Sequence, residues 1–242
     1  MLQTSEGRRS LETLFNVCTP GSLDDPDNQK SFAGDGVVYI PAQSNDPSCT
    51  SSYCNIASIC KLMVDPTAGT PLDKLVTLSK AQEGGACVSA NYQAELTLYS
   101  NPNLSDRLWL YQTCTEWGFY QTCEVGTKCP YTQGLHTLSY DYQLCQVAFG
   151  VAPADVDYQV NYANTMYGGS NIQSSRTFFV NGEIDPWHAN SVLVSPNDEE
   201  PTLWVVGASH HFWTHPSKPT DSKEVVAARQ AIWDQVGEWL KL

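Results

Sequence analysis

Residues 176–188, which read RTFFVNGEIDPWH, constrain the fold more than any other stretch of the sequence. Residues 177–180 are β-branched or aromatic, which is typical of a short buried strand. Asn181-Gly182 breaks that strand, and Asp185-Pro186 predicts a turn at its carboxyl end. We therefore expect Asp185 to be held at the end of a buried strand, where a carboxylate can act on other residues.

A second strand with a polar turn follows about twenty residues later. Residues 203–206 predict the strand, Gly207-Ala208 ends it, and Ser209-His210-His211 comes next. Neighbouring strands that end in an aspartate and then a histidine follow the order of these residues in the α/β-hydrolase triad. In such a triad the aspartate orients the imidazole, whose other nitrogen takes a proton from a nucleophile. The pattern predicts an α/β fold with Asp185 and His210 as catalytic residues.

The same residues have simpler explanations. Asp185 could only cap its turn, as an aspartate before proline often does. His210 and His211 could be surface residues, or could bind a metal together with His215. Their spacing does not match the H-E-x-x-H helix of zinc peptidases, and the neighbouring Gly, Ser and Pro disfavour a helix. We therefore expect no metal site.

The nucleophile has no candidate in its usual sequence context, because no Gly-x-Ser-x-Gly motif occurs in the chain. Ser170, in the run Gly168-Gly169-Ser170-Asn171, lacks the second glycine and precedes a strand instead of joining a strand to a helix. We reject Ser170 as the nucleophile.

The charge balance argues against nucleic acid as a partner. The chain has 26 Asp and Glu against 13 Lys and Arg, whereas phosphate binding needs clustered basic residues. A hydrophobic content of 41% and a charged content of 16% indicate a globular protein. No run of eighteen apolar residues occurs, so we expect no membrane span.

Nine cysteines without a C-x-x-C pair indicate disulfides formed in an oxidising compartment, and not a zinc site. The odd count leaves at least one thiol without a partner in this chain. Asn103-Leu104-Ser105 is a glycosylation sequon, which adds weak support for a secreted glycoprotein. The first residues, MLQTSEGRRSLETLF, lack the apolar region of a signal peptide, so we expect the true N-terminus to be missing.

Helical patterns fill the first part of the chain. We expect helices at residues 3–15 and 50–63 and a helix that begins at Thr70-Pro71, with a polar loop reaching about Lys30. These helices predict a cap domain at residues 1–95 and a hydrolase part at residues 96–242. The clearest helix, capped by Asp221 or Ser222, runs through to Leu240.

Residues 108–123, which read LWLYQTCTEWGFYQTC, are dense in aromatic side chains. Core packing explains such a composition without any function. Glu116 lies among these aromatic residues, and a buried carboxylate must be paired or functional because burying it alone is costly. We therefore include Glu116 among the candidate substrate-binding residues.

Four segments resemble one peptidase family. They are EGRRSLETLFNVC, WLYQTCTEWGFYQTC, MYGGSNIQSSRTFFVNGEIDPWH and VVGASHHFWTHP, which begin at residues 6, 109, 166 and 205. The chain resembles the C-terminal half of peptidase family S28, which groups lysosomal prolylcarboxypeptidase with dipeptidyl peptidase 7 and thymus-specific serine protease. The resemblance covers nearly the whole chain, and N-G-E-I-D-P-W followed by G-A-S-H is specific to this family.

The resemblance implies roles for individual residues. Asp185 matches the triad aspartate, and His210 matches the triad histidine, with His211 as an alternative because the G-A-S-H-H run aligns one step either way. Trp187 matches a tryptophan near the proline-binding subsite, where a flat apolar wall suits a pyrrolidine ring. The run His211-Phe212-Trp213 stands where relatives carry other residues after the histidine, which implies an altered substrate pocket that includes Trp213. The family's nucleophile segment lies upstream, and nothing in this chain corresponds to it.

The sequence thus predicts the C-terminal part of an α/β-hydrolase sheet with a helical, disulfide-containing cap. The complete protein would be a serine exopeptidase that cleaves peptide substrates next to proline, without a cofactor, in the lysosome, in the vacuole or outside the cell. We expect the isolated chain to be inactive. A sheet without its first strands exposes an edge, which predicts aggregation or a partner such as a second copy in a homodimer. The alternative is a short non-catalytic protein that binds peptides through the remaining cleft.

Overall fold

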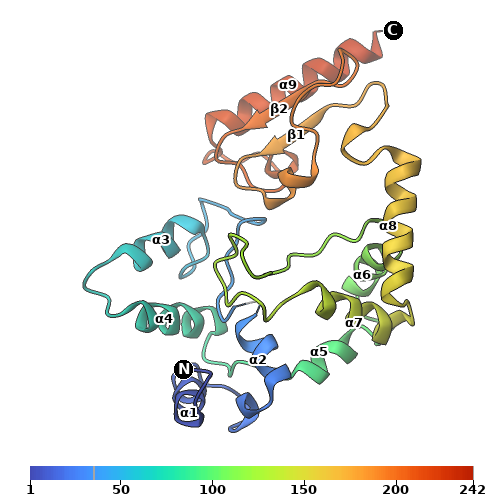
Figure 1. The fold of residues 1–242 in the computed structure, drawn as a ribbon. Helices are drawn as coiled ribbons and strands as arrows, with labels where there is room; N and C mark the ends of the chain where they lie inside the picture. The colour runs from blue at the N-terminus through green and yellow to red at the C-terminus, as the bar shows by residue number, and fades with distance from the viewer. Residues whose placement is uncertain (35, 242) are drawn as a thin grey trace. The chain divides into compact units, whose positions relative to one another are not determined.

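The computed structural model describes residues 1–34 and 36–241, which form two compact units (Figure 1). The first unit contains Met1–Tyr39 and Thr67–Met166, and the second contains Ile40–Pro66 and Tyr167–Leu242. The expected boundary between residues 95 and 96 lies inside the first unit. Residues 40–66, which we expected in the cap, pack with the second unit. The assignment of a cap and a hydrolase part stays a prediction.

The first unit is helical. Thr70 caps a helix through its side chain and Pro71 is its first residue, as the sequence predicted. The polar loop expected up to Lys30 is wrong, because Asp25 caps a helix that begins at Pro26. The helices are α1 (Ser5–Leu14), α2 (Pro26–Ala33), α4 (Pro71–Glu83), α5 (Tyr92–Leu98), α6 (Asp106–Gln112), α7 (Leu138–Phe149) and α8 (Pro153–Tyr167), with short turns η1 (Ser22–Asp24) and η2 (Thr113–Trp117).

Two apolar clusters form the core of the first unit. One contains Phe15 and Phe32, whose ring centroids lie 5.5 Å apart. The other joins α5, α6, α7 and α8 around the buried disulfide Cys114–Cys145. Tyr92 and Leu96 on α5 belong to this second cluster together with residues far beyond position 96. The packing therefore continues across the boundary that the sequence suggested.

The second unit contains a two-stranded parallel sheet, β1 (Phe179–Gly182) and β2 (Thr202–Val205), with Phe179 opposite Thr202. Both strands lie within two residues of the predicted ranges. Helix α9 (Lys223–Leu240) contacts β2, and Ser222 is its cap. In Figure 1 the sheet and α9 lie together at the orange and red end of the chain. The remaining elements of this unit are α3 (Ile56–Val64), η3 (Gly169–Asn171), η4 (Pro186–Asn190) and η5 (Phe212–Thr214).

A fully buried carboxylate ties together the segments that lead into the two strands. Glu200, which is 0% exposed, comes just before β2 and accepts hydrogen bonds from the backbone and hydroxyl of Ser174, which comes before β1. Its other oxygen accepts a hydrogen bond from Asn197 Nδ2 at 2.8 Å. These hydrogen bonds satisfy polar groups that would otherwise be costly to bury. Glu200 therefore helps to hold together the segments that lead into β1 and β2.

Four disulfides cross-link the described residues, and Cys60 on α3 is an exposed free thiol. This outcome confirms that the odd cysteine count leaves one thiol unpaired within the chain. The helix expected at residues 50–63 begins only at Ile56, after a loop that the Cys49–Cys54 disulfide closes. The other three disulfides are Cys18–Cys87, Cys114–Cys145 and Cys123–Cys129. None of the helices in the described residues is both long and apolar enough to cross a bilayer.

Candidate active site

The turns after β1 and β2 lie against each other at the carboxyl ends of the strands. The amide of Ile184 donates to the carbonyl oxygen of Ala208 at 3.0 Å. A Cβ atom on Gly182 would lie 2.5 Å from that same oxygen. Only glycine permits such a close approach of the two backbones, so Gly182 lets the two turns meet. The strand break predicted at Asn181-Gly182 is wrong, because these are the last two residues of β1.

Asp185 and His210 form a hydrogen-bonded pair in this place. Asp185 Oδ2 lies 2.7 Å from His210 Nδ1, and Asp185 is only 5% exposed. Its Oδ1 accepts the backbone N–H of Trp187 at 2.9 Å. Both carboxylate oxygens are thus engaged, so the aspartate caps its turn and orients the imidazole at the same time.

The second imidazole nitrogen of His210, Nε2, remains available. The His210 side chain is 35% exposed, and within the described part of the chain no group forms a hydrogen bond with Nε2. An imidazole held through Nδ1 by a buried carboxylate, with Nε2 open, has the geometry of a general base awaiting a nucleophile.

His211 does not reach the carboxylate. It is exposed, has a left-handed backbone with φ of 38°, and places its Nδ1 3.0 Å from Thr214 Oγ1. Its ring centroid lies 4.6 Å from that of His210. Of the two histidines that the alignment left open, the structure brings His210 to Asp185.

The three candidate substrate-binding residues differ in their placement. Trp187 is half-buried, and its ring centroid lies 6.0 Å from that of His210. Trp213 is 9% exposed and packs in a cluster with Val205 and Val225, so its packing gives no support to a substrate contact.

The structure contradicts the expectation that Glu116 is buried. Glu116 is exposed on η2, in the first unit, and several of the aromatic side chains around it in sequence are exposed too, including Trp109 and Trp117. The burial of Glu116 that we inferred from the aromatic density of this stretch is wrong, because its side chain is exposed on η2. Core packing holds for other residues of the stretch, since Leu110 and Cys114 are buried in a core cluster. A role of Glu116 in substrate binding has no support from burial.

Residues 43–46 belong to the site, although nothing in the sequence indicated it. The carbonyl oxygen of Gln43 accepts the backbone N–H of His210 at 3.1 Å, and its side-chain Oε1 accepts the indole N–H of Trp187 at 2.8 Å. The carbonyl oxygen of Asn45 accepts the hydroxyl of Ser209 at 2.9 Å. We call residues 43–46 the strap. No local sequence pattern predicts contacts between residues that lie more than 140 positions apart in the sequence.

Asp46 anchors the end of the strap through an ion pair with Lys218 at 2.8 Å. Hydrogen bonds from Lys218 and from Ser48 lower the pKa of the Asp46 carboxyl to about 2. A lowered folded-state pKa means that the stabilisation is present above the ordinary value of 3.8 and is lost as the pH falls towards 2. The strap therefore keeps this anchor in mildly acidic solution.

We expect Asp46→Asn to lower the free energy of unfolding by about 1 kcal/mol, because the pair is partly screened by solvent. The loss is equal at about pH 5 and about pH 7, is much smaller near pH 2, where the wild-type carboxyl is half protonated, and vanishes below that pH. Thermal melts at the three pH values measure it. Lys223→Met removes a 92% exposed lysine and serves as control. Equal melting temperatures of Asp46→Asn and wild type at about pH 5 would contradict the prediction.

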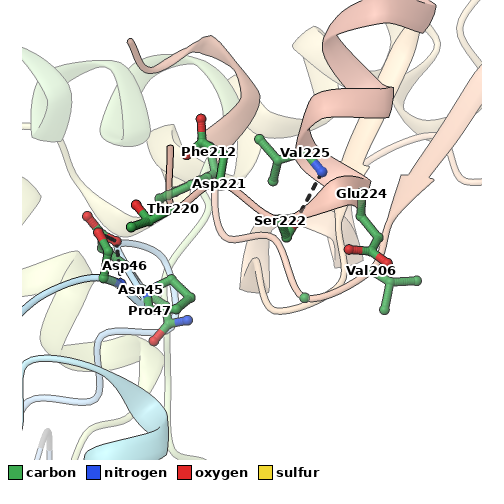
Figure 2. Close-up of a pocket in the computed structure, with 12 residues that line it drawn as sticks. Asn45, Asp46, Pro47, Val206, Phe212, Thr220, Asp221, Ser222, Glu224 and Val225 are labelled. Carbon is green, nitrogen blue, oxygen red and sulfur yellow. Dashed lines mark hydrogen bonds between the residues drawn. The ribbon is translucent and has the colours of Figure 1, made fainter. Parts of the chain in front are cut away.

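A cavity of about 330 Å³ opens beside this region of the second unit (Figure 2). Residues 45–48 line one side of it, and the turn that leads into α9 lines another. Its carboxylates Asp46, Asp221 and Glu224 are already ion-paired, and neither Asp185 nor His210 lines it. Among the described residues, His, Cys, Asp and Glu side chains form no group of three that could hold a metal ion.

Comparison with known proteins gives one family. The sequence model of the family described as Serine carboxypeptidase S28 matches residues 1–232. The chain is 36% identical over 235 residues to thymus-specific serine protease from Mus musculus, covering 91% of this chain and 45% of that protein. The Homo sapiens protein of the same name is 34% identical, covering 96% and 47%. Lysosomal Pro-X carboxypeptidase from Homo sapiens is 25% identical, covering 98% and 48%.

The chain spans about half the length of the curated relatives it matches. Family membership implies an α/β-hydrolase fold. The helices, the small parallel sheet and the four disulfides of the described residues are consistent with part of such a fold and a helical cap. The family match and the relatives above 30% identity together establish that this chain belongs to the Serine carboxypeptidase S28 family of peptidases.

Proposed function

We propose that the chain is the C-terminal part of a serine exopeptidase that cleaves peptide bonds next to proline. The observation that carries this proposal is the Asp185–His210 hydrogen bond of 2.7 Å, which joins a buried carboxylate to an imidazole with an open Nε2. Relatives bear the names serine protease and Pro-X carboxypeptidase. The serine comes from a segment outside these 242 residues.

The chemistry follows from the geometry of the pair. His210 Nε2 takes the proton of the serine hydroxyl while the serine oxygen forms a bond to the carbonyl carbon of the peptide. The imidazolium then gives this proton to the leaving amine as the carbon–nitrogen bond breaks. Water hydrolyses the acyl-enzyme with His210 as base again. Asp185 holds the imidazole with Nε2 toward the reaction and stabilises its positive charge.

Substrate selection involves Trp187 and the cap. Trp187 lies beside His210, and its half-buried indole offers a flat apolar surface to a pyrrolidine ring. The helices and disulfides of the first unit are consistent with a cap, and in this proposal the cap limits substrates to the ends of peptides. In this proposal the chain supplies the histidine and the aspartate of the reaction but not the serine nucleophile. The isolated 242-residue chain therefore has no turnover.

The cysteines and the relatives support an assignment of the compartment. Four disulfides persist in oxidising surroundings. Among the relatives are a lysosomal carboxypeptidase and a probable extracellular serine carboxypeptidase from Arthroderma benhamiae. We place the protein in the lysosome, in a vacuole or outside the cell.

The test captures the protein from its source through a tag at the C-terminus, which retains whatever precedes Met1. Purified protein is offered two peptide sets, one with proline next to the last residue and one with proline as the second residue. Each set has an alanine counterpart. Cleavage of proline peptides in preference to alanine peptides supports the proposal, and the cleaved set gives the direction of trimming. Binding of these peptides without any cleavage would support the non-catalytic alternative.

A further inference from the structure

The strap contacts both turns that carry the candidate catalytic pair. On one turn, Gln43 Oε1 accepts the indole N–H of Trp187, two residues after Asp185. On the other turn, the Gln43 carbonyl oxygen accepts the backbone N–H of His210. Gln43 thus holds the turn that carries Asp185 and the turn that carries His210 at the same time.

A second bond reinforces the hold on the histidine turn, and it is buried. Ser209, which is 1% exposed, donates its hydroxyl to the carbonyl oxygen of Asn45, which is 5% exposed. Removing this donor leaves the buried carbonyl oxygen of Asn45 without its partner. The free-energy cost of that unsatisfied acceptor is larger than the stabilisation that an exposed hydrogen bond contributes. The Ser209–Asn45 bond therefore resists displacement of the turn.

The strap is itself anchored, so it can act as a fixed support. Asn45 Oδ1 accepts the backbone N–H of Ile56 at the start of α3, at 2.9 Å. Asp46 pairs with Lys218 at 2.8 Å. These anchors at Asn45 and Asp46 keep the strap in place, which a free loop of this length would not do.

We propose that Gln43 and Ser209 are positioning residues for the Asp185–His210 pair. This inference rests on the proposed peptidase function and adds to it two residues that touch neither the substrate nor the reacting atoms. Their role is to hold the imidazole where its Nε2 meets the nucleophile. Catalytic groups need placement to within about 0.5 Å, so a turn that loses its support loses turnover before it loses substrate affinity.

Two substitutions separate the contacts. Gln43→Met keeps the size of the side chain but removes the acceptor for the Trp187 indole, whereas Gln43→Glu restores an acceptor. The charge that Gln43→Glu adds is screened, because the position is exposed. Ser209→Ala removes the donor to Asn45. Gln230→Met is the matched control, because Gln230 takes no part in the site and donates its side-chain amide to Asp234 on the exposed face of α9.

The first measurement is hydrogen exchange of the backbone amide of His210, followed by mass spectrometry in the tagged protein. We expect faster exchange in Gln43→Met and Ser209→Ala, and wild-type exchange in Gln43→Glu and Gln230→Met. The second is steady-state kinetics on the preferred proline peptide. We expect kcat to fall about two- to tenfold in Gln43→Met and Ser209→Ala, with KM unchanged in Ser209→Ala, which leaves the Trp187 contact intact, and kcat to recover in Gln43→Glu.

The hydrogen-exchange and kinetic measurements together distinguish a failure of this inference from a failure of the proposed peptidase function. Unchanged exchange and unchanged kcat in both Gln43→Met and Ser209→Ala overturn the positioning role, whatever the enzyme does. A rise in KM with kcat unchanged also overturns it, because the residues would then act on substrate binding. Absence of turnover in the wild type refutes the peptidase function alone, and the exchange rates still decide whether the strap holds the turn.

Discussion

Asp185→Asn is expected to lower kcat/KM of the peptidase by about 1,000- to 10,000-fold while the protein stays folded. The amide oxygen can still accept the N–H of Trp187, so the turn keeps its cap. The amide nitrogen, however, presents a donor to His210 Nδ1 where the wild type presents an acceptor at 2.7 Å. The imidazole must then carry its proton on Nε2, the atom that should receive the proton of the serine.

His211→Gln is the matched control for this prediction. His211 is the neighbouring histidine in sequence, but it is exposed and bonds Thr214 instead of Asp185. We expect its kcat/KM to stay within about threefold of the wild type, as for a surface residue without a catalytic contact. Circular dichroism and thermal melts check the fold of both variants. Strong loss in His211→Gln together with normal turnover in Asp185→Asn would show that the histidine has been assigned to the wrong position.

The sequence predicted the part of the site that short-range patterns determine. Two short runs of β-branched and aromatic residues gave both strands, and the polar turn after each strand placed Asp185 and His210 at neighbouring strand ends. The structure adds the distance between them, which follows from parallel pairing and from the close approach at Gly182. Pairing of strands is a long-range event, and the alternation of residues alone does not fix it.

Burial was harder to predict than secondary structure. Trp213 and Glu116 both occur among aromatic residues, yet Trp213 is buried and Glu116 is exposed. Aromatic density says that a segment has apolar area to bury, but the direction of each side chain depends on which neighbours its element packs against. In residues 106–117, helix α6 continues into a π-helical turn, which changes the face that each following residue presents.

The strap could not be predicted from the sequence. Gln43 and Asn45 lie in a polar stretch without regular structure. Each accepts one hydrogen bond through a backbone carbonyl oxygen, which every residue possesses, and one through a side-chain oxygen from a residue outside the strap. Helix α2, in contrast, was missed although its signal was present. Asp25-Pro26 places a cap residue before a proline at the first helical position, which is a signal for the start of a helix. The polar composition of α2 hid this signal, because the segment reads as a loop.

Removing the Cys114–Cys145 disulfide by Cys114→Ala together with Cys145→Ala is expected to destabilise the first unit by about 3–5 kcal/mol. The bond joins η2 to α7 across a separation of 31 residues, so its loss frees a long loop in the unfolded chain. Both cysteines are 0% exposed within the core cluster of α5, α6, α7 and α8, so the substitution also leaves a cavity among apolar side chains. Urea unfolding monitored by tryptophan fluorescence measures the change.

Cys123→Ala together with Cys129→Ala is the control for that disulfide. Its sequence separation of 6 residues closes a short loop, and the same entropic relation gives about 2 kcal/mol. The two double variants therefore differ in loop length and in how much of the core they disturb, while the chemistry of the change is identical. Equal losses would show that loop length and core packing do not set the stability of this unit. A larger loss at Cys123–Cys129 would place its stability in the loop after η2 instead of in the helical cluster.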